Sequence, residues 1–269
     1  QGWIGKNYSD EFESRGLEVV RYSLDEKYVG NRDKIKNCDI VFIAVPTPST
    51  PQGFDASIVE ENFKLIGEGK VVVVKSTIVP GTTKAWQEKY PNIKVFYSPE
   101  FLSEATAKHD VENPFANIIG VGLDTEENRA LAQTVLDILP EASYKLICTS
   151  SEAEMMKYSH NINGYIQIVL WNMMYDISKK IGADWPTVKS FIKADPMMND
   201  RYTEPVHKSG RGAGGACFIK DMAALRELYV NIFPQDLPGA KVFQSIEAKN
   251  IDLLLSTNKD LHLLSGVYG

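Results

Sequence analysis

Between residues 39 and 148, short apolar runs rich in β-branched residues alternate with longer segments of helical spacing such as 57–67 and 125–139. Continuous apolar runs are typical of strands that are buried on both faces, so this alternation predicts an α/β domain with a Rossmann-like parallel sheet. Ligands of such sheets bind beyond the carboxyl ends of the strands, which directs attention to the loops that follow these runs. The runs span residues 39–45, 70–75, 94–97, 117–121 and 145–148.

From residue 150 onward the pattern becomes helical. Residues 152–180 keep helical spacing without a proline, and Ser150 or Ser151 is a suitable N-cap. Gly164 lies within this helix, and we expect it to weaken or bend it. The sequence therefore predicts a nucleotide-binding domain at 1–149, a central helical domain at 150–235, and one C-terminal helix with a tail at 236–269.

Composition excludes several classes of protein. The chain has 269 residues, 43% of them hydrophobic, and a net charge of −6, which argues against a general nucleic-acid or anionic-membrane binder. No apolar run approaches the ~20 residues of a membrane helix, and no signal peptide is recognisable, so a cytoplasmic location is expected. The three cysteines and four histidines show no ligand spacing, so no metal site is predicted.

The first five residues, Gln-Gly-Trp-Ile-Gly, look like the end of a dinucleotide-binding fingerprint whose first glycine and preceding strand are missing. In that interpretation Gly2 and Gly5 let the backbone approach a pyrophosphate at a helix N-terminus. Residues 16–23 are then expected to form the second strand, with Ser23 at the ribose-binding position. An ordinary tight turn explains the glycines equally well, and Arg21 and Lys27 leave NADP open as an alternative to NAD.

A glycine-rich segment, Gly-Arg-Gly-Ala-Gly-Gly-Ala-Cys-Phe-Ile-Lys-Asp at 210–221, places Cys217 in a flexible setting. With five other segments it resembles the UDP-glucose/GDP-mannose dehydrogenase family. Ile219, Ala213 and Asn117 depart from the family pattern, but none of these changes removes a catalytic group. The other matching segments, in the family's order, are residues 44–48, 75–80, 98–104, 154–161 and 200–201.

The resemblance implies a fold and an activity. The fold is a Rossmann domain followed by a helical dimerisation domain, and the family's third, nucleotide-binding domain is expected to be absent from this chain. The activity is NAD-dependent oxidation of a nucleotide sugar at C6 to the carboxylate, as in UDP-glucose to UDP-glucuronate, through a cysteine thioester. A UDP-sugar substrate and a homodimer are the implied partners.

The resemblance also assigns catalytic roles. Cys217 is the nucleophile, and because an ordinary thiol is mostly protonated at neutral pH, nearby cations such as Lys157 and Lys220 would activate it. Lys157 and Asn161 are four residues apart and therefore share one helix face, where they could stabilise an oxyanion. The remaining assignments are Asp221 and Thr77, which hold a water, and Glu100, which serves thioester hydrolysis.

Further residues match contacts to cofactor and substrate. Arg201 matches an arginine that reaches across the dimer to the partner's substrate. The cofactor-binding candidates are Gly2, Gly5, Ser23, Thr47, Thr77, Glu104 and Lys220. The substrate-binding candidates are Glu100, Phe101, Leu102, Lys157, Asn161, Arg201, Val206, Gly210 and Gly214.

Each of these residues also has an ordinary structural interpretation. Most cysteines outside disulfides are buried and inert, an exposed Lys or Asn on a helix is usually solvated, and a threonine after a strand often caps a turn. Two other functions also stay open. One is a two-electron β-hydroxyacid dehydrogenase, which would not need Cys217, and the other is a non-catalytic dimeric module that binds nucleotide sugars.

Overall fold

The computed structural model describes residues 2–103 and 105–269. The chain forms two compact units. The sheet unit comprises residues up to Thr47 together with Asp55–Lys157, and the helical unit comprises Pro48–Phe54 together with Tyr158–Gly269. Among the described helices, none is long and apolar enough to cross a membrane.

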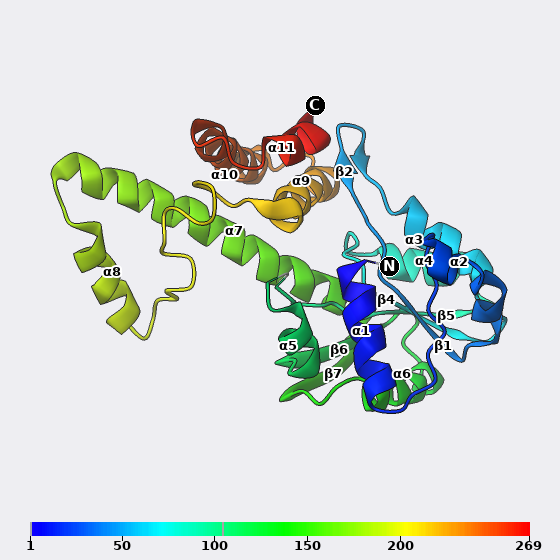
Figure 1. The fold of residues 1–269 in the computed structure, drawn as a ribbon. Helices are drawn as coiled ribbons and strands as arrows, with labels where there is room; N and C mark the ends of the chain where they lie inside the picture. Colours follow the sequence, from blue (N-terminus) through cyan, green and yellow to red (C-terminus); the bar gives the residue numbers. More distant parts are fainter. Residues whose placement is uncertain (1, 104) are drawn as a thin grey trace. The chain divides into compact units, whose positions relative to one another are not determined.

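A five-stranded sheet forms the centre of the sheet unit, in the order β1-β4-β5-β6-β7 (Figure 1). Every apolar run that the sequence analysis singled out contributes one strand. The four valines of β4 are fully buried between β1 and β5, as expected for a strand covered on both faces. The strands are β1 (Ile40–Ile43), β4 (Val71–Val74), β5 (Lys94–Tyr97), β6 (Ala116–Val121) and β7 (Tyr144–Thr149).

The sheet is mixed in direction, which the sequence analysis did not anticipate. β1, β4 and β5 are parallel, and so are β6 and β7, but β6 runs antiparallel to β5. β5 and β6 pair at their carboxyl ends, where Tyr97 lies opposite Gly120. Strand composition reports burial but not direction, because direction depends on the path of the connecting segment. The predicted parallel order therefore holds within each group of strands but not across the β5–β6 junction.

Helices α1 (Trp3–Ser14) and α6 (Glu126–Ile138) cover the same face of this sheet. Tyr8 and Phe12 of α1 and Val135 of α6 share one buried cluster with Val73 of β4. Burial of each such side chain stabilises the unit by ~1.5–3 kcal/mol. The other helices of the unit are α2 (Glu26–Val29), α3 (Ser57–Asn62), α4 (Thr82–Lys89) and α5 (Ala107–Glu112), with 3-10 turns at Arg32–Asn37 and Phe63–Leu65.

The predicted second strand at residues 16–23 is wrong. Residues 17–23 form neither strand nor helix. A strand is stabilised by its ladder of hydrogen bonds to a neighbour, and the edge strand of the described sheet is β1, whose partner is β4. The apolar character of residues 17–20 instead serves packing, since Val19 lies against the cluster beneath α1.

The helical unit is built on α7 (Ser150–Ile181), which begins in the sheet unit and continues through Gly164 without a break. The expected weakening at Gly164 is therefore not seen. A Cβ atom there would lie 3.0 Å from the hydroxyl of Tyr202 and 3.1 Å from Phe218. The glycine thus gives two aromatic side chains room to approach the helix.

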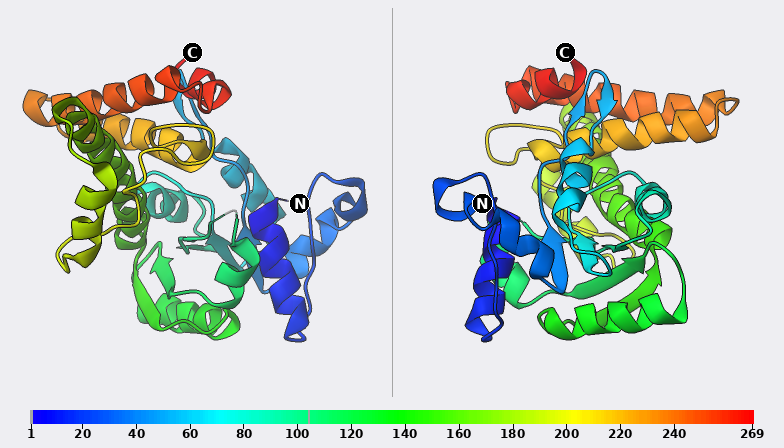
Figure 2. Two further views of the ribbon diagram at one scale, coloured as in Figure 1. Left: turned by 60° about the vertical axis from the view of Figure 1, so that its left-hand side comes forward. Right: turned by 90° about the vertical axis from the view of Figure 1, so that its right-hand side faces the viewer.

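Four more helices complete the helical unit: α8 (Trp185–Ala194), α9 (Gly215–Ile232), α10 (Leu237–Ser256) and α11 (Leu261–Tyr268). The last two correct the prediction of a single C-terminal helix. α9, α10 and α11 lie side by side around Ile219, Leu254 and Leu264 (Figures 1 and 2). Asp236 begins α10 by accepting a hydrogen bond from the N–H of Gly239.

A hairpin of two short strands, β2 (Ser49–Thr50) and β3 (Gly53–Phe54), belongs to the helical unit although it follows β1 in the chain. The Ser49 hydroxyl donates a hydrogen bond of 2.9 Å to the carbonyl of Lys220 in α9. Strands of two residues leave no periodic pattern in the sequence, so this feature was not predicted.

Candidate active site

Thr47, Thr77 and Glu100 follow β1, β4 and β5, which are neighbouring parallel strands of the sheet unit. The carboxyl ends of such strands meet at one edge of the sheet, which is where ligands of this fold bind. The Thr47 hydroxyl donates to the carbonyl of Thr77 at 2.7 Å and is buried. Thr47 therefore ties the first loop to the second, in keeping with the structural role left open for it, while Thr77 is half-buried.

Lys157 and Glu100 form a buried pair beyond this edge. The Lys157 ammonium donates to the backbone carbonyl of Glu100 at 2.7 Å and lies 3.8 Å from its carboxylate. The other carboxylate oxygen accepts the N–H of Leu102 at 2.9 Å, and the ammonium lies 5.5 Å from the ring centre of Phe101. Both side chains are less than 9% exposed. The fold thus brings four of the predicted residues into one desolvated cluster.

Lys75 belongs to the same environment, and sequence reasoning gave it no role. It is buried, donates to the hydroxyl of Ser98 at 3.1 Å, and lies 4.5 Å from the ring centre of Tyr8. Burial lowers the pKa of Lys75 to about 8, against the attraction of Glu100 and with a further contribution from the positive charge of Lys157. The signal in the sequence was a lysine that directly follows four consecutive buried valines.

The N-terminus of α1 fits the pyrophosphate of a dinucleotide. Gly2 is the N-cap, no side chain caps this end, and a Cβ atom at Gly2 would meet nothing within 4 Å. The helix dipole and its first N–H groups favour an anion at this position. Gly5 lies in the first turn, whereas Ser23 donates its hydroxyl to Asp25 at 2.8 Å. Glu104 lies outside the described residues.

In the helical unit, Asn161 and Lys220 converge on one carboxylate. The Asn161 amide donates to Asp221 at 2.6 Å, and the Lys220 ammonium donates to the other carboxylate oxygen at 2.5 Å. Asp221 is 1% exposed, so these two donors satisfy a charge that is otherwise costly to bury. Cys217 lies one helical turn before Asp221 on α9.

Cys217 differs from the other two cysteines in its surroundings. It is exposed in the first turn of α9, whose dipole favours a thiolate. Cys148 is buried in β7, and burial raises its pKa to about 11. Burial also raises the pKa of the half-buried Cys38. The exposed position at a helix N-terminus is the one that suits a nucleophile.

The glycine loop before α9 contains the remaining substrate-binding candidates of the helical unit. Val206 is exposed, Gly210 is buried and Gly214 is half-buried. The loop glycines were expected to offer backbone N–H groups to a sugar. The N–H groups of Ala213 and Gly215 instead donate to side chains of the C-terminal segment, so they are already occupied within the protein.

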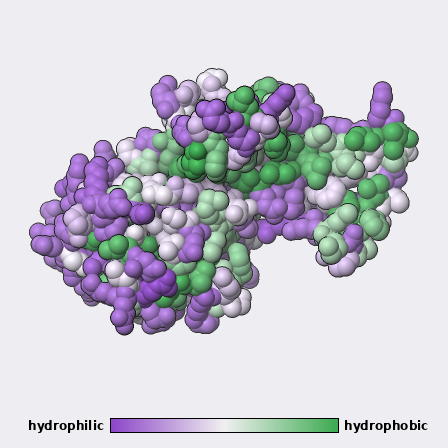
Figure 3. Space-filling model, turned by 180° about the vertical axis from the view of Figure 1, so that it is seen from behind, coloured by the Kyte–Doolittle hydropathy of each residue, from purple (hydrophilic) through white to green (hydrophobic). Residues whose placement is uncertain are grey.

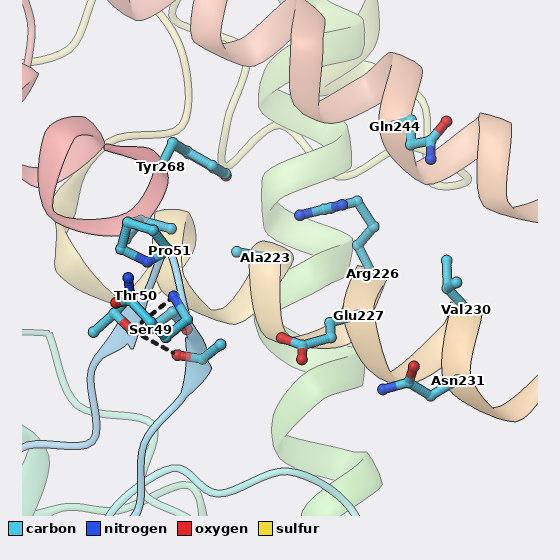
Figure 4. A pocket seen from close by; sticks show the side chains of 13 residues that line it. Ser49, Thr50, Pro51, Ala223, Arg226, Glu227, Val230, Asn231, Gln244 and Tyr268 are labelled. Atoms are coloured by element: carbon cyan, nitrogen blue, oxygen red, sulfur yellow. Dashed lines mark hydrogen bonds between the residues drawn. The ribbon is translucent and has the colours of Figure 1, made fainter.

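A hollow of about 470 Å³ also lies in the helical unit, between the β2–β3 hairpin and α9, α10 and α11 (Figure 4). Arg226, Gln244 and Tyr268 extend toward it. Arg226 lies 2.9 Å from the carboxylate of Glu247, which also accepts the Tyr268 hydroxyl at 2.8 Å. None of the predicted site residues lines this hollow.

Comparison with known proteins identifies the family. Residues 2–138 match the NAD binding domain of the UDP-glucose/GDP-mannose dehydrogenase family, and residues 151–250 match its central domain. A UDP-glucose 6-dehydrogenase of Rickettsia typhi is 31% identical over 234 residues, which cover 82% of this chain and 51% of that protein. The chain thus spans about half the length of this curated relative.

Solved structures share the fold. A UDP-glucose dehydrogenase from the hyperthermophilic archaeon Pyrobaculum islandicum superimposes with a TM-score of 0.77 at 24% identity, covering 92% of this chain and 66% of that one. A 3-hydroxyisobutyrate dehydrogenase of Mycobacterium tuberculosis gives 0.70 at 14% identity, covering 93% and 92%. The predicted α/β fold is confirmed, and NAD is the cofactor that the matched N-terminal domain implies. The chain belongs to the UDP-glucose/GDP-mannose dehydrogenase family.

Proposed function

We propose that this protein oxidises the C6 alcohol of a nucleotide sugar to the carboxylate, converting UDP-glucose to UDP-glucuronate through a thioester on Cys217. The observation that carries the proposal is the position of Cys217, exposed in the first turn of α9 and one turn before the buried Asp221. NAD, when bound, accepts one hydride in each of two oxidations.

The cysteine divides the reaction into accessible steps. The first oxidation gives the C6 aldehyde, and the Cys217 thiolate then adds to its carbonyl carbon, giving a thiohemiacetal. Loss of hydride from C6 of this adduct gives the thioester, and attack by water releases the carboxylate and restores the thiol. Two hydrides leave the sugar, and the oxygen gained comes from water.

Other residues are proposed to serve charge and protons. The Lys157 ammonium, together with the Asn161 amide, would stabilise oxygen that becomes negative at C6. Burial of Lys157 strengthens such an interaction because little water screens it. Glu100 would assist attack of water on the thioester, with Asp221 and Thr77 holding a water nearby. The proximity of Cys217 to Lys157 stays a prediction.

The decisive experiment counts NADH formed per UDP-glucose consumed by the intact protein. We expect two, and we expect Cys217→Ser to form no carboxylate, whereas the matched variant Cys38→Ser keeps the ratio at two. A ratio of one with full turnover by Cys217→Ser would instead identify a two-electron dehydrogenase. Binding of UDP-glucose without NADH formation would identify a binding module.

We propose in addition that two copies associate through the helical unit. The end of α7 and helix α8 expose a series of large apolar side chains, which appear as green areas in Figure 3, and surfaces of this kind mark interfaces. The exposed Arg201 would then reach the partner's substrate. The apolar side chains are Leu170, Met173, Met174, Ile177, Ile181 and Phe191.

Sedimentation of the intact protein tests this association. We expect a dimer, which Ile177→Glu dissociates because it places a charge in an apolar interface. An exposed change away from this surface, Lys84→Glu on α4, should leave the dimer intact. A wild-type monomer at all concentrations would contradict the proposal.

A further inference from the structure

The C-terminal segment makes a dense set of hydrogen bonds to the glycine loop that precedes Cys217. Four of its side chains take part, and we call them the C-terminal clamp. They come from the last turns of α10 and from the turn that leads into α11. The clamp consists of Asn250, Thr257, Lys259 and Asp260.

Asn250 binds one peptide unit of the loop from both sides. Its side-chain oxygen accepts the N–H of Ala213 at 2.6 Å, and its amide donates to the carbonyl of the same residue at 3.0 Å. Asn250 is 1% exposed and Ala213 is fully buried. A buried pair of hydrogen bonds fixes orientation as well as distance, because loss of either leaves a polar group unsatisfied.

Lys259 holds the carbonyl side of the loop. Its ammonium donates to the carbonyl of Gly212 at 2.9 Å and to that of Gly210 at 3.4 Å, and the side chain is buried. The residues on either side, Asn258 and Asp260, both have φ of 54°. Left-handed backbone at two non-glycine residues is uncommon and costs energy, although Asn and Asp tolerate it best. This turn is therefore shaped to present the side chains between α10 and α11.

The other two side chains of the clamp act at the edges of the loop. Thr257 accepts the N–H of Arg211 at 3.0 Å. Asp260 accepts the N–H of Gly215 at 2.8 Å, and Gly215 is the first residue of α9. Cys217 lies two residues later in the same turn. Asp260 thus fixes the start of the helix that presents the thiol.

Close approach explains two of the loop glycines. A Cβ atom at Gly210 would lie 2.4 Å from the Thr257 hydroxyl, and one at Gly214 would lie 2.2 Å from the Asp260 carboxylate. Real Cβ contacts are longer than this, so these positions require glycine where the clamp meets the loop.

We propose that the C-terminal clamp positions Cys217 for reaction, by holding the backbone of the glycine loop and the first residue of α9 in place. The proposal rests on the function proposed for Cys217 and adds Asn250, Lys259 and Asp260 to it as positioning residues. These side chains act through the backbone of the loop.

The test compares Asn250→Leu and Lys259→Met with Lys249→Met, an exposed lysine on α10 that pairs with Asp252. Hydrogen exchange is measured at the amides of 211–215, together with the rate at which iodoacetamide alkylates Cys217. For Asn250→Leu we expect exchange at Ala213 to rise about tenfold, the equivalent of one lost hydrogen bond. Exchange at Leu253 and Leu254 should stay unchanged in Lys259→Met, which shows that α10 remains folded.

Turnover supplies the second readout. We expect Asn250→Leu and Lys259→Met to alter the alkylation rate of Cys217 and to lower kcat while leaving the KM for NAD unchanged. Asp260→Asn, which keeps an acceptor for Gly215, should retain the wild-type rates. If loop exchange rises but alkylation and kcat match those of Lys249→Met, the clamp does not position Cys217 and the proposal is overturned. Altered exchange and alkylation in a protein whose wild-type form makes no NADH would support the clamp and refute the proposed function.

Discussion

The two units hold their functional groups in different ways. In the sheet unit the reactive charges themselves are buried, because Lys157 and Glu100 are both less than 9% exposed and contact each other. In the helical unit the proposed nucleophile Cys217 is exposed, and its supports Asn250 and Lys259 are buried. A charge that stabilises an oxyanion gains from desolvation, whereas a nucleophile must be accessible and needs a fixed backbone. Changes in the sheet unit should therefore cost more.

The largest expected effect is on the stability of the sheet unit. Glu154 is fully buried in α7 and accepts hydrogen bonds from the N–H of Gly81 and from both the N–H and the hydroxyl of Thr83, at the start of α4. Glu154→Leu leaves these donors unsatisfied and should lower the free energy of unfolding by about 4 kcal/mol. Urea unfolding measures this loss, and the exposed Glu88→Gln should change stability by less than about 0.5 kcal/mol. Equal stability of both variants would remove the contrast between the units.

The second prediction concerns catalysis. Lys157→Met removes the buried ammonium beside Glu100, and if it stabilises an oxyanion, kcat should fall about 100- to 1,000-fold. Steady-state kinetics with UDP-glucose and NAD measures the change, and Lys84→Met on the exposed side of α4 provides the control. A fall in kcat of less than about threefold would place Lys157 outside the chemistry.

The third prediction uses the buried Lys75. Its pKa is about 8 in the folded protein and 10.5 in an ordinary setting. Between these values the unfolded chain binds the proton more readily than the folded one, so stability rises with pH across this window. The contribution of Lys75 therefore opposes folding below pH 8 and is relieved by roughly 3 kcal/mol toward pH 10.5. The difference in unfolding free energy between wild type and Lys75→Met should follow this curve, and a difference independent of pH would contradict it.

The smallest effects are expected in the helical unit and test the fit between loop and clamp. Gly210→Ala places a Cβ atom against Thr257 and should cost about 2 kcal/mol. Gly266→Ala in α11 meets nothing within 4 Å and should stabilise the helix by about 0.5 kcal/mol. Thermal unfolding of both variants measures the contrast, and similar midpoints would show that the loop tolerates displacement.

Sequence reasoning succeeded where one local cause decides the structure. The valines of β4 predicted a buried strand, and helical spacing after Thr125 predicted α6, whose N-cap Thr125 accepts the N–H of Asn128. Direction and partnership were beyond its reach. Residues 17–23 have strand-like composition but no ladder, and β6 runs antiparallel because of the path of the connection before it.

The candidate site divides in the same manner. Motifs identified Lys157, Glu100 and Asp221, which lie buried with partners within their own units. The roles of Lys75 and Lys259 were missed, because a lysine is usually exposed and only tertiary contacts reveal its burial. The clamp in particular joins residues that are nearly forty positions apart in the chain.

The most direct measurement is the mass of the Cys217 peptide after the intact protein has been mixed with UDP-glucose and NAD and quenched in acid. With the Glu100→Gln variant, in which hydrolysis should be slow, we predict a sugar acyl adduct on Cys217 that requires NAD and that hydroxylamine removes. An unmodified Cys217 while NADH accumulates, or an adduct on Cys38 or Cys148 instead, would contradict the account.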